Sequence, residues 1–324
     1  MSLLEIKGLE TEFQTEQGVV KALRGINYTV DRGEVLGIVG ESGSGKSVGM
    51  LSLMGLLAPN GTVTAGEMIF DGEDISPIKY KTKKEKKEYE KKMNQIRGND
   101  ISMIFQDPMS YLNPIVTIEK QMTEGIRFHT KCSKKEAVQR AIELMKMVGI
   151  PAPESRLKQY PFEFSGGMRQ RIIIAIALAC NPKLIVADEP TTALDVTIQT
   201  QIMDLMRQMN KKTNTAILLI SHDLGVVSRL CSRVYIMYAG RIVESGPVDE
   251  ILTNPLHPYT KGLVEAIPDI TKRGKPLKAI PGSVPGLYAR NNTGCGFAER
   301  CEYCTNKCQK EVPPLVQEDG RAVA

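Results

Sequence analysis

The octapeptide GESGSGKS at residues 40–47 stands between the apolar run EVLGIV (residues 34–39) and an apolar helical pattern over residues 47–57. A glycine, four residues and then Gly-Lys-Ser, placed between a strand and a helix, is typical of a phosphate-binding loop. Glycines let the backbone wrap a phosphate chain so that amide N–H groups converge on it, and the helix start adds partial positive charge. Lys46 would reach the terminal phosphates, and the Ser47 hydroxyl would ligate Mg²⁺. We expect the nucleotide to be bound by Gly40, Ser42, Gly43, Ser44, Gly45, Lys46 and Ser47.

A second apolar stretch, KLIVADEP at residues 183–190, contains two adjacent acids, Asp188 and Glu189. Ligands of open parallel sheets collect at the carboxyl ends of the strands, so these acids are expected beside the phosphate loop. We predict that Asp188 holds Mg²⁺ through water and that Glu189 acts as the general base on the attacking water. The alternative is that the two carboxylates only end a strand. Together with the phosphate loop, the acids predict a nucleoside triphosphatase.

The order of the apolar segments predicts the fold class. Two continuous apolar runs, residues 183–188 and 216–221, flank a helix-like segment, which predicts a parallel sheet covered on both faces. Residues 3–39 are typical of short strands with an antiparallel start, whereas helical periodicity dominates residues 107–179. We therefore expect an α/β fold with an antiparallel β subdomain and a helical subdomain.

The composition is that of a globular protein. Hydrophobic residues make up 42% and charged residues 24% of the 324 residues, which argues against a disordered or membrane-embedded chain. At roughly 150 residues per domain, the length suggests one large domain with an appendage. The sequence has no run of about 18 apolar residues and no signal-peptide layout, so we expect a cytosolic chain unless a partner holds it at a membrane.

Most of the net charge of +5 comes from one stretch, residues 79–92, which holds eight Lys and three Glu. Such a stretch is usually a solvated helix or a mobile loop. The alternative is an electrostatic contact of these lysines with acidic lipid or nucleic acid.

The seven cysteines are unevenly distributed, and four lie within fourteen residues near the C-terminus: Cys295, Cys301, Cys304 and Cys308. In a reducing compartment this crowding suggests a metal site rather than disulfides. Four thiolates suit either tetrahedral Zn²⁺ or a 4Fe–4S cluster, and the unequal spacing without paired CxxC knuckles favours the cluster. Free or disulfide-linked thiols are the remaining alternative. A bound metal would staple a small tail that lacks a large apolar core.

The heptapeptide FSGGMRQ at residues 164–170 narrows the class of triphosphatase. It resembles the LSGGQ signature of ABC ATPases, and it lies at the start of an apolar helix upstream of the acidic strand, as in that family. Four further positions match the family's pattern: Phe13 as the adenine-stacking aromatic, Gln106 as the Q-loop glutamine on Mg²⁺, Asp195 in the D-loop, and His222 as the switch histidine on the γ-phosphate. A phenylalanine buried in a strand, a polar strand cap and a structural histidine are the alternatives for Phe13, Gln106 and His222.

The resemblance implies a mechanism in which two ATPase subunits stack head to tail. ATP is then held between the phosphate loop of one subunit and Ser165, Gly166 and Gly167 of the other, so that one subunit supplies half of each site. Two departures from LSGGQ, Phe164 for leucine and Met168 for glutamine, leave open whether the two composite sites are equivalent.

A further resemblance concerns the C-terminal part of the chain. NPLHPYTKGLVEAIP (residues 254–268) and IPGSVP (residues 280–285) resemble the extension of dipeptide/oligopeptide importer ATPases. The resemblance implies an ABC ATPase domain at residues 1–267, with a helical subdomain near residues 107–180, and a small metal-stapled extension at residues 268–324. In that importer subgroup a cysteine set of this kind is associated with a 4Fe–4S cluster.

The same resemblance implies partners and a location. We expect a second ABC ATPase subunit (a paralogue or another copy), two transmembrane permease subunits and, indirectly, an extracytoplasmic peptide-binding protein. The chain would hydrolyse ATP at the cytoplasmic face of the cell membrane, as a peripheral subunit that drives peptide import. A soluble ABC ATPase acting on nucleic acid is the main alternative, but neither the tandem ATPase domains nor the long coiled coil usual in that class is present. A redox or interaction module centred on the cysteines is the second alternative.

Overall fold

The computed structural model describes residues 2–106, 111–192, 194–267, 279–290, 293–318 and 320–324. Within these ranges the chain forms two compact units. The first unit comprises residues 1–31, 35–83 and 219–324, and the second comprises residues 32–34 and 84–218. The boundary expected between the ATPase domain (residues 1–267) and the extension (residues 268–324) falls at the edge of the described residues.

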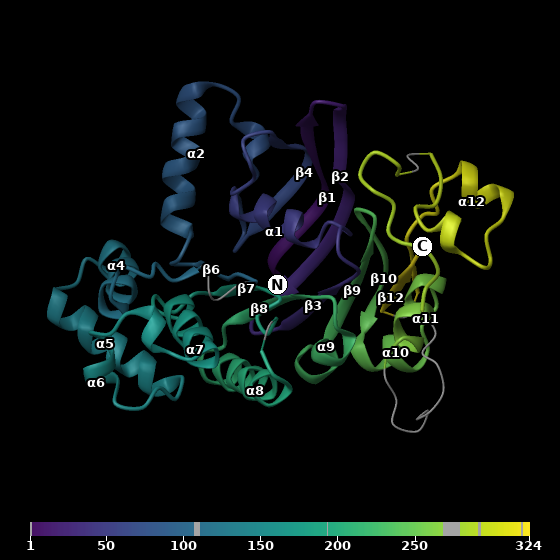
Figure 1. The fold of residues 1–324 in the computed structure, drawn as a ribbon. Coiled ribbons are helices and arrows are strands. Elements are labelled where there is room, and N and C mark those ends of the chain that lie inside the picture. The colour runs from purple at the N-terminus through teal and green to yellow at the C-terminus, as the bar shows by residue number, and fades with distance from the viewer. Residues whose placement is uncertain (1, 107–110, 193, 268–278, 291–292, 319) are drawn as a thin grey trace. The chain divides into compact units, whose positions relative to one another are not determined.

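The first unit contains an antiparallel sheet with the strand order β2-β1-β4-β5. Its strands are β1 (Ser2–Thr15), β2 (Gly18–Asp31), β4 (Gly61–Phe70) and β5 (Glu73–Asp74). The start is antiparallel, as predicted, but β1 and β2 are 14 residues each rather than short. Register shifts along β1, for example between Ile6 and Leu9, let such long strands bend while one face stays buried. Figure 1 shows this pair in purple beside β4.

A second sheet in the first unit carries the phosphate loop. Its strands follow the order β11-β12-β10-β9-β3. β3 (Val35–Val39) pairs parallel with β9 (Arg233–Tyr238), and all five residues of β3 are buried, as its continuous apolar run predicts. The antiparallel remainder consists of β10 (Arg241–Pro247), β11 (Val316–Glu318) and β12 (Arg321–Val323). The last residues of the chain therefore add strands to the sheet from which the phosphate loop emerges.

The helices of the first unit are short. They are α1 (Lys46–Met54), η1 (Pro77–Lys79), α9 (Leu224–Leu230), α10 (Val248–Thr253), α11 (Pro258–Glu265), η4 (Ala298–Arg300) and α12 (Asn306–Lys310). Helix α1 is the one predicted after the phosphate loop, and it ends early because Gly55 adopts the left-handed conformation that caps a helix. Helix α10 packs against β10 and α9 (Figure 1).

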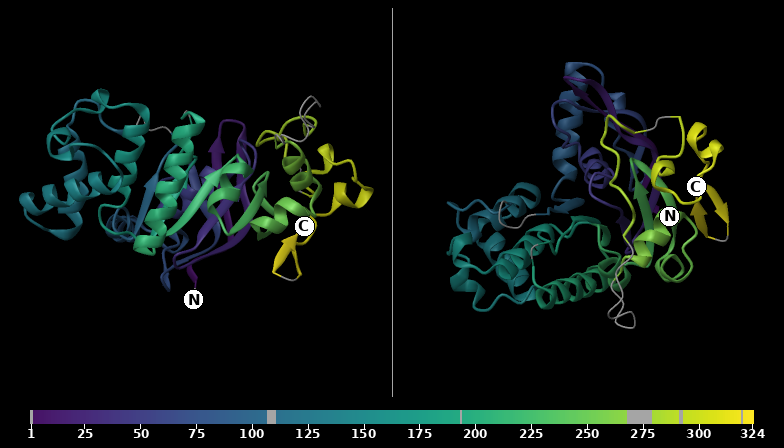
Figure 2. Two further views of the ribbon diagram at one scale, coloured as in Figure 1. Left: turned by 90° about the horizontal axis from the view of Figure 1, so that it is seen from below. Right: turned by 45° about the vertical axis from the view of Figure 1, so that its right-hand side comes forward.

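The second unit is mainly helical. Its helices are α2 (Lys83–Ile96, from Lys84 onward), α4 (Ile118–Thr130), α5 (Lys134–Met147), α6 (Pro153–Arg156), η2 (Pro161–Glu163), α7 (Gly166–Ala177) and α8 (Val196–Thr213). Ser133 and Glu136 form a capping box at the start of α5, as the S-x-x-E spacing predicts. Helices α4, α5, α6 and α7 lie together in every view of Figures 1 and 2.

Two parallel strands accompany these helices in the second unit. β6 (Ile101–Ile104) pairs with β7 (Leu184–Asp188), with Ile101 opposite Leu184. β8 (Ala216–Ser221) follows, and the chain passes from the second unit to the first after Leu218. All residues of β7 and β8 are buried, which agrees with the prediction of parallel strands covered on both faces. None of the described helices is both long and apolar enough to cross a membrane.

Candidate functional site

The predicted phosphate loop leaves β3 and leads directly into α1. Gly40 must be a glycine, because a Cβ at this position would lie 2.1 Å from the carbonyl oxygen of Met237 on β9. Gly45 precedes α1 as its N-cap and offers no side-chain cap, so the first N–H groups of the helix are left for a ligand. Ser47 is exposed in the first turn of α1. The loop thus has the backbone of an anion site with an available hydroxyl.

Lys46 lies within this loop rather than in solvent. Its side chain is buried, and Nζ donates to the carbonyl oxygens of Gly40 (2.6 Å) and Glu41 (3.0 Å). A buried ammonium requires such partners, since desolvation of an unpaired charge is costly. The lysine predicted to bind phosphate is therefore hydrogen-bonded to carbonyl groups of the loop itself.

Two other predicted residues of the first unit are His222, which follows a strand, and Phe13, which lies within one. His222 is exposed directly after β8, and Asp223 next to it caps α9 by accepting from the N–H groups of Gly225 (2.7 Å) and Val226 (3.4 Å). Phe13 is half-buried on β1, and its ring packs so closely on Gly61 of β4 that a Cβ there would lie 2.7 Å from it. Phe13 is thus neither fully buried nor free of strand packing.

The predicted general base, Glu189, is held by two polar side chains of the second unit. Gln106 Nε2 donates to Glu189 Oε2 at 2.9 Å, and Thr192 Oγ1 donates to the same oxygen at 3.0 Å. Glu189 has a φ of 45°, a left-handed conformation that is unusual for a residue with a side chain and is common at functional sites. Its neighbour Asp188 ends β7 and is buried. The structure therefore brings together two residues, Gln106 and Glu189, that are 83 positions apart.

The SGG sequence forms the N-terminal tip of α7. Ser165 is the exposed N-cap, and its Oγ accepts from the N–H of Met168 at 3.4 Å. Gly166 and Gly167 are the first two residues of the helix. Asp195, the predicted D-loop acid, caps α8 in the same way by accepting from the N–H of Ile198 at 2.9 Å. Tips of this kind present backbone N–H groups and positive dipole ends to an anion.

Two residues not predicted as functional, Arg169 and Gln170, follow the signature tip in α7 and hold it through hydrogen bonds. Arg169 Nε donates to the carbonyl oxygens of Pro161 (2.8 Å) and Phe164 (3.0 Å). Gln170 is fully buried, and its Nε2 donates to the carbonyl oxygen of Pro190 at 2.6 Å. Gln170 therefore ties the signature helix to the residue that follows Glu189. No clear sequence signal marks this buried contact, because Gln170 lies between Arg169 and Arg171, ahead of the apolar run of the helix.

A family model described as "ABC transporter" matches residues 23–192, a range that includes the phosphate loop, the signature tip and the two acids. The chain belongs to the ABC transporter family. It is therefore an ATP-hydrolysing subunit of a transporter. A second model, described as "Oligopeptide/dipeptide transporter, C-terminal region", matches residues 243–308 of this ABC ATPase.

Relatives resemble this ABC ATPase over nearly its full length. The oligopeptide transport ATP-binding protein OppD of Bacillus subtilis (strain 168) is 50% identical over 315 residues, covering 97% of this chain and 85% of that protein. The dipeptide transport ATP-binding protein DppD of Escherichia coli (strain K12) is 46% identical over 322 residues, with 99% and 95% covered. Among solved structures, the dimeric ATP-binding cassette MJ0796 bound to ADP and Pi is similar with a TM-score of 0.64 at 27% identity, covering 76% of this chain and 98% of that chain.

The expected metal staple of this ABC ATPase is not supported. In the described part of the chain, no group of three or more His, Cys, Asp or Glu side chains is arranged to hold a metal ion. The four C-terminal cysteines (Cys295, Cys301, Cys304 and Cys308) are free thiols. Burial raises the pKa of the Cys295 and Cys301 thiols, which favours the protonated form over the thiolate that a metal needs. The fold class therefore stands without its metal-stapled element.

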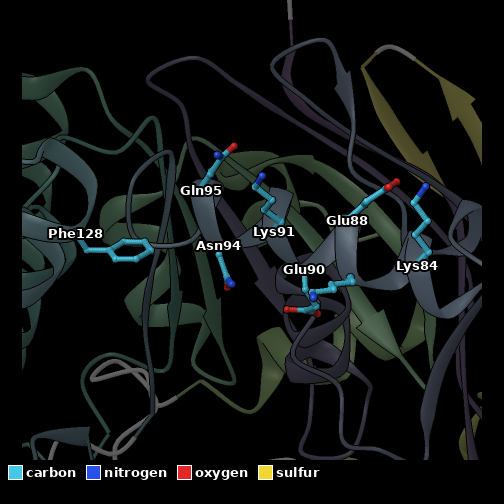
Figure 3. Close-up of a pocket in the computed structure, with 8 residues that line it drawn as sticks. Lys84, Glu88, Glu90, Lys91, Asn94, Gln95 and Phe128 are labelled. Carbon is cyan, nitrogen blue, oxygen red and sulfur yellow. The ribbon is translucent and has the colours of Figure 1, made fainter.

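The lysine-rich stretch forms the exposed helix α2, as the interpretation of a solvated helix predicts. A hollow of about 690 Å³ beside it is lined by Lys84, Lys87, Glu88, Glu90, Lys91, Asn94, Gln95 and Phe128. Figure 3 shows the labelled α2 side chains on one side of this hollow and Phe128, which comes from α4, on the other. Because glutamates alternate with the lysines, the lining is not of one sign and gives no specific indication of an acidic ligand.

Proposed function

We propose that this chain is the ATP-binding and ATP-hydrolysing subunit of an ABC importer of dipeptides or oligopeptides. The observation that carries the proposal is the presence, in one chain, of the ABC transporter match at residues 23–192 and the oligopeptide/dipeptide transporter C-terminal match at residues 243–308. Relatives named as oligopeptide and dipeptide transport ATP-binding proteins, at 50% and 46% identity, support the same class of cargo.

In this proposal the phosphate loop binds the triphosphate of ATP. Lys46 leaves the carbonyl oxygens of Gly40 and Glu41 and pairs with the terminal phosphates, which compensates the buried charge better than neutral carbonyls do. The N–H groups of the loop and the uncapped start of α1 bind phosphate oxygens. Phe13 stacks on the adenine.

Mg²⁺ is the cofactor that the ATP site implies. Ser47, Gln106 and Asp188 would hold it, with hydroxyl, amide and carboxylate oxygens that suit this hard cation. When bound, Mg²⁺ neutralises phosphate charge as the bond to the γ-phosphate breaks.

Glu189 is the proposed general base. The hydrogen bonds from Gln106 and Thr192 to its Oε2 fix the direction of the carboxylate that would take a proton from the attacking water. His222 is proposed to contact the γ-phosphate, and its exposed position after β8 leaves it accessible to a ligand.

A second ATPase subunit completes the site in this proposal. The exposed Ser165 tip, with Gly166 and Gly167, would bind the γ-phosphate of ATP that sits on the phosphate loop of the partner subunit. MJ0796, the similar solved cassette, is described as dimeric and bound to ADP and Pi, which supports a nucleotide-linked dimer. ATP binding would then join the two subunits, and hydrolysis would release them.

Two transmembrane permease subunits are the proposed membrane partners, and an extracytoplasmic binding protein delivers the peptide to them. Two large apolar side chains of the second unit are exposed: Ile115, nine positions after Gln106 in the sequence, is 82% exposed, and Phe162, just before the signature sequence, is 67% exposed. The Phe162 ring also stacks on Tyr160, with ring centroids 5.7 Å apart. Exposed apolar side chains of this kind are common at protein–protein contacts, so they are candidates for the permease contact at the cytoplasmic membrane face.

The proposal is tested by assembling the transporter. The chain is co-expressed with its candidate permease and partner ATPase subunits, purified through a tag on the permease, and reconstituted in liposomes. ATP hydrolysis should rise when the binding protein is loaded with a dipeptide or oligopeptide, and it should not rise with single-stranded DNA. Failure to co-purify with any permease, or stimulation by DNA but not by peptide, would contradict the proposed function.

We also propose that the four C-terminal cysteines take up a 4Fe–4S cluster, with Zn²⁺ as the alternative. The support is their short spacing and the hydrogen bond from Cys295 N–H to the Cys308 carbonyl oxygen (2.7 Å), which closes the segment into a loop. Side chains must rearrange to bind, because no three of them stand ready for a metal. Iron and zinc are measured after anaerobic purification of the full chain. A folded chain with neither metal would rule the proposal out.

A further inference from the structure

Three side chains from the C-terminal third of the chain contact the phosphate loop at Glu41 and Gly43. The N–H of Glu41 donates to Tyr259 Oη at 2.9 Å. The Glu41 carboxylate accepts two hydrogen bonds from Arg300, Nη1 to Oε2 at 2.6 Å and Nη2 to Oε1 at 3.1 Å. Such a forked contact fixes the direction of a carboxylate as well as its distance. Both the backbone and the side chain of Glu41 are therefore held from outside the loop.

Arg300 is itself rigidly placed. Its side chain is only 6% exposed, and its Nε donates to the carbonyl oxygen of Pro281 at 2.7 Å. The guanidinium lies over the rings of Tyr238 and Phe297, 5.8 and 5.9 Å from their centroids. These rings pack edge-to-face at 5.2 Å. A guanidinium stacked on aromatic rings and bonded at Nε has little freedom left, so its position transfers to Glu41.

Arg290 makes a second, independent contact with the loop. It is buried, and its Nη2 donates to the carbonyl oxygen of Gly43 while Nη1 donates to that of Ala22 at 3.3 Å. Its Nε is buried without a hydrogen-bond partner among the described residues, and burial lowers the pKa of the guanidinium. The hydrogen bonds of the Arg290 guanidinium go to the neutral carbonyl groups of Ala22 and Gly43 rather than to a carboxylate. A charge buried at this cost indicates that the position of Arg290 matters more than its contribution to stability.

The contacts of Tyr259 and Arg300 hold Glu41, whose carbonyl group is one of the two that Lys46 uses. Lys46 Nζ donates to Gly40 and Glu41, so moving Glu41 moves one of the two anchors of the lysine. When Lys46 turns to phosphate it gives up both bonds. The loop must then keep its shape without them, and Arg300, Tyr259 and Arg290 are the groups in place to hold it.

We propose that Arg290 and Arg300 are positioning residues of the ATP site, by which the C-terminal region sets the affinity of the phosphate loop for ATP. The inference rests on the proposed function, in which this loop binds ATP. A loop held in its binding conformation loses less freedom on binding, so its affinity is higher than that of a free loop. Both arginines lie within residues 243–308, the region that matches the oligopeptide/dipeptide transporter model. In this proposal, that region contributes to ATP binding in addition to indicating the transporter class.

The test compares Arg300→Gln and Arg290→Gln with a matched control, Arg321→Gln. Arg321 is also a mostly buried arginine of the C-terminal region, but it pairs with Glu244 at 2.7 Å and does not contact the loop. ATP affinity is measured on the full chain by titration with a fluorescent ATP analogue. KM and kcat for ATP are measured on the assembled transporter, and melting temperature without nucleotide reports stability.

We expect Arg300→Gln and Arg290→Gln to weaken ATP binding and to raise KM by about tenfold each, with kcat within about twofold of wild type, as for a lost charge-assisted contact. Arg321→Gln should lower the melting temperature without changing KM. Arg300→Lys should recover part of the affinity, because it restores the charge but not the fork.

Unchanged ATP affinity in both folded loop variants would overturn the proposal, as would an equal rise of KM in Arg321→Gln. If Arg300→Gln does not fold, the double variant Glu41→Gln/Arg300→Gln removes the pair without leaving a buried charge, and the same KM criterion applies to it. The variant Lys46→Ala distinguishes failure of the positioning role from failure of the proposed ATP site. If this variant also binds ATP normally, the loop is not the ATP site and the proposed function fails rather than the positioning role.

Discussion

The phosphate loop and the signature tip both lie at helix N-termini, which suit phosphate binding. They differ in which parts of the chain hold them in place. The loop forms hydrogen bonds with Tyr259, Arg290 and Arg300, which lie more than 200 residues away in the sequence. The signature tip is supported by Arg169 and Gln170 of its own helix and by Ile198 of α8 beside Gly167, and its N-cap is exposed.

In the proposed function, this difference indicates which half of the ATP site is complete in one chain. A loop with its backbone fixed and its lysine stored nearby is organised to take ATP before any partner arrives. In the proposed dimer, the exposed N-cap Ser165 and the helix start that follows it would meet a phosphate presented by another subunit. Nucleotide affinity should therefore depend on the loop and its C-terminal contacts, and dimer formation on the tip.

The largest expected effect comes from the base and leaves both halves of the comparison intact. Glu189→Gln keeps an acceptor for Gln106 and Thr192 but cannot take a proton, so turnover should fall by about 10³-fold. ATP affinity and ATP-dependent association should persist. Steady-state ATPase assays and analytical ultracentrifugation with ATP measure the two. Turnover within a few-fold of wild type would refute the assigned base.

Removing the lysine of the phosphate loop should weaken ATP binding by the loop and leave the signature tip intact. Lys46→Ala deletes the charge that pairs with phosphate, so ATP affinity should fall by about 10 to 100-fold. The signature tip is untouched, and the second unit should keep its fold by circular dichroism. Normal nucleotide affinity in titration calorimetry would count against the loop assignment.

Acid pH should lower the stability of the protein through protonation of His257, which contacts Tyr259. Burial lowers the pKa of His257 to about 4, although Glu244 acts in the opposite direction, and Nδ1 accepts from the N–H of Tyr259 at 3.0 Å. In the unfolded chain the pKa is near 6.5, so the unfolded state binds the proton first as pH falls. Stability is therefore complete above about pH 6.5 and declines toward pH 4, by up to about 3 kcal/mol.

His257→Asn is the matched variant, because asparagine can still cap α11 but does not titrate in this range. Urea unfolding between pH 4.5 and 7.5 should show a shallower loss of stability toward acid in the variant than in wild type. Identical slopes would mean that His257 is not the group responsible.

Two neighbouring glycines sharpen the description of the signature tip. A Cβ on Gly167 would lie 2.9 Å from Ile198 Cγ2, whereas a Cβ on Gly166 meets nothing closer than Leu194 Cδ2 at 3.9 Å. Gly167→Ala should therefore cost about 1–2 kcal/mol of stability through overpacking, and Gly166→Ala should be close to neutral. Melting temperatures of the two variants in parallel check this, and equal shifts would show that α8 does not confine the tip.

Local motifs made much of the fold and the site predictable. The phosphate loop, the acids at the end of β7 and the capped start of α5 depend on patterns of a few residues, and each appears at the predicted place in the chain. The grip on the loop was not predictable, because no local pattern marks a pairing between Glu41 and Arg300, which are 259 positions apart. The buried contact of Gln170 was not predictable either, because Gln170 lies between Arg169 and Arg171 in the sequence.

The cysteines show where spacing alone fails. Four thiols within fourteen residues satisfy the count for a metal site, but ligation needs convergent and deprotonated side chains. Neither property can be obtained from spacing. The lengths of β1 and β2 were underestimated for a related reason, since the bulges that let a long strand bend leave no residue pattern as clear as a turn.

The most direct test of the account is the position of Ser165 in an ATP-bound complex. Glu189→Gln protein, assembled with its partner ATPase and permeases, is trapped with ATP and Mg²⁺ and solved by electron cryo-microscopy. The account predicts Ser165 and the N–H groups of Gly166 and Gly167 within hydrogen-bond distance of a γ-phosphate that lies on the partner subunit's phosphate loop. A γ-phosphate bound by the loop with every signature tip far from it would contradict the account.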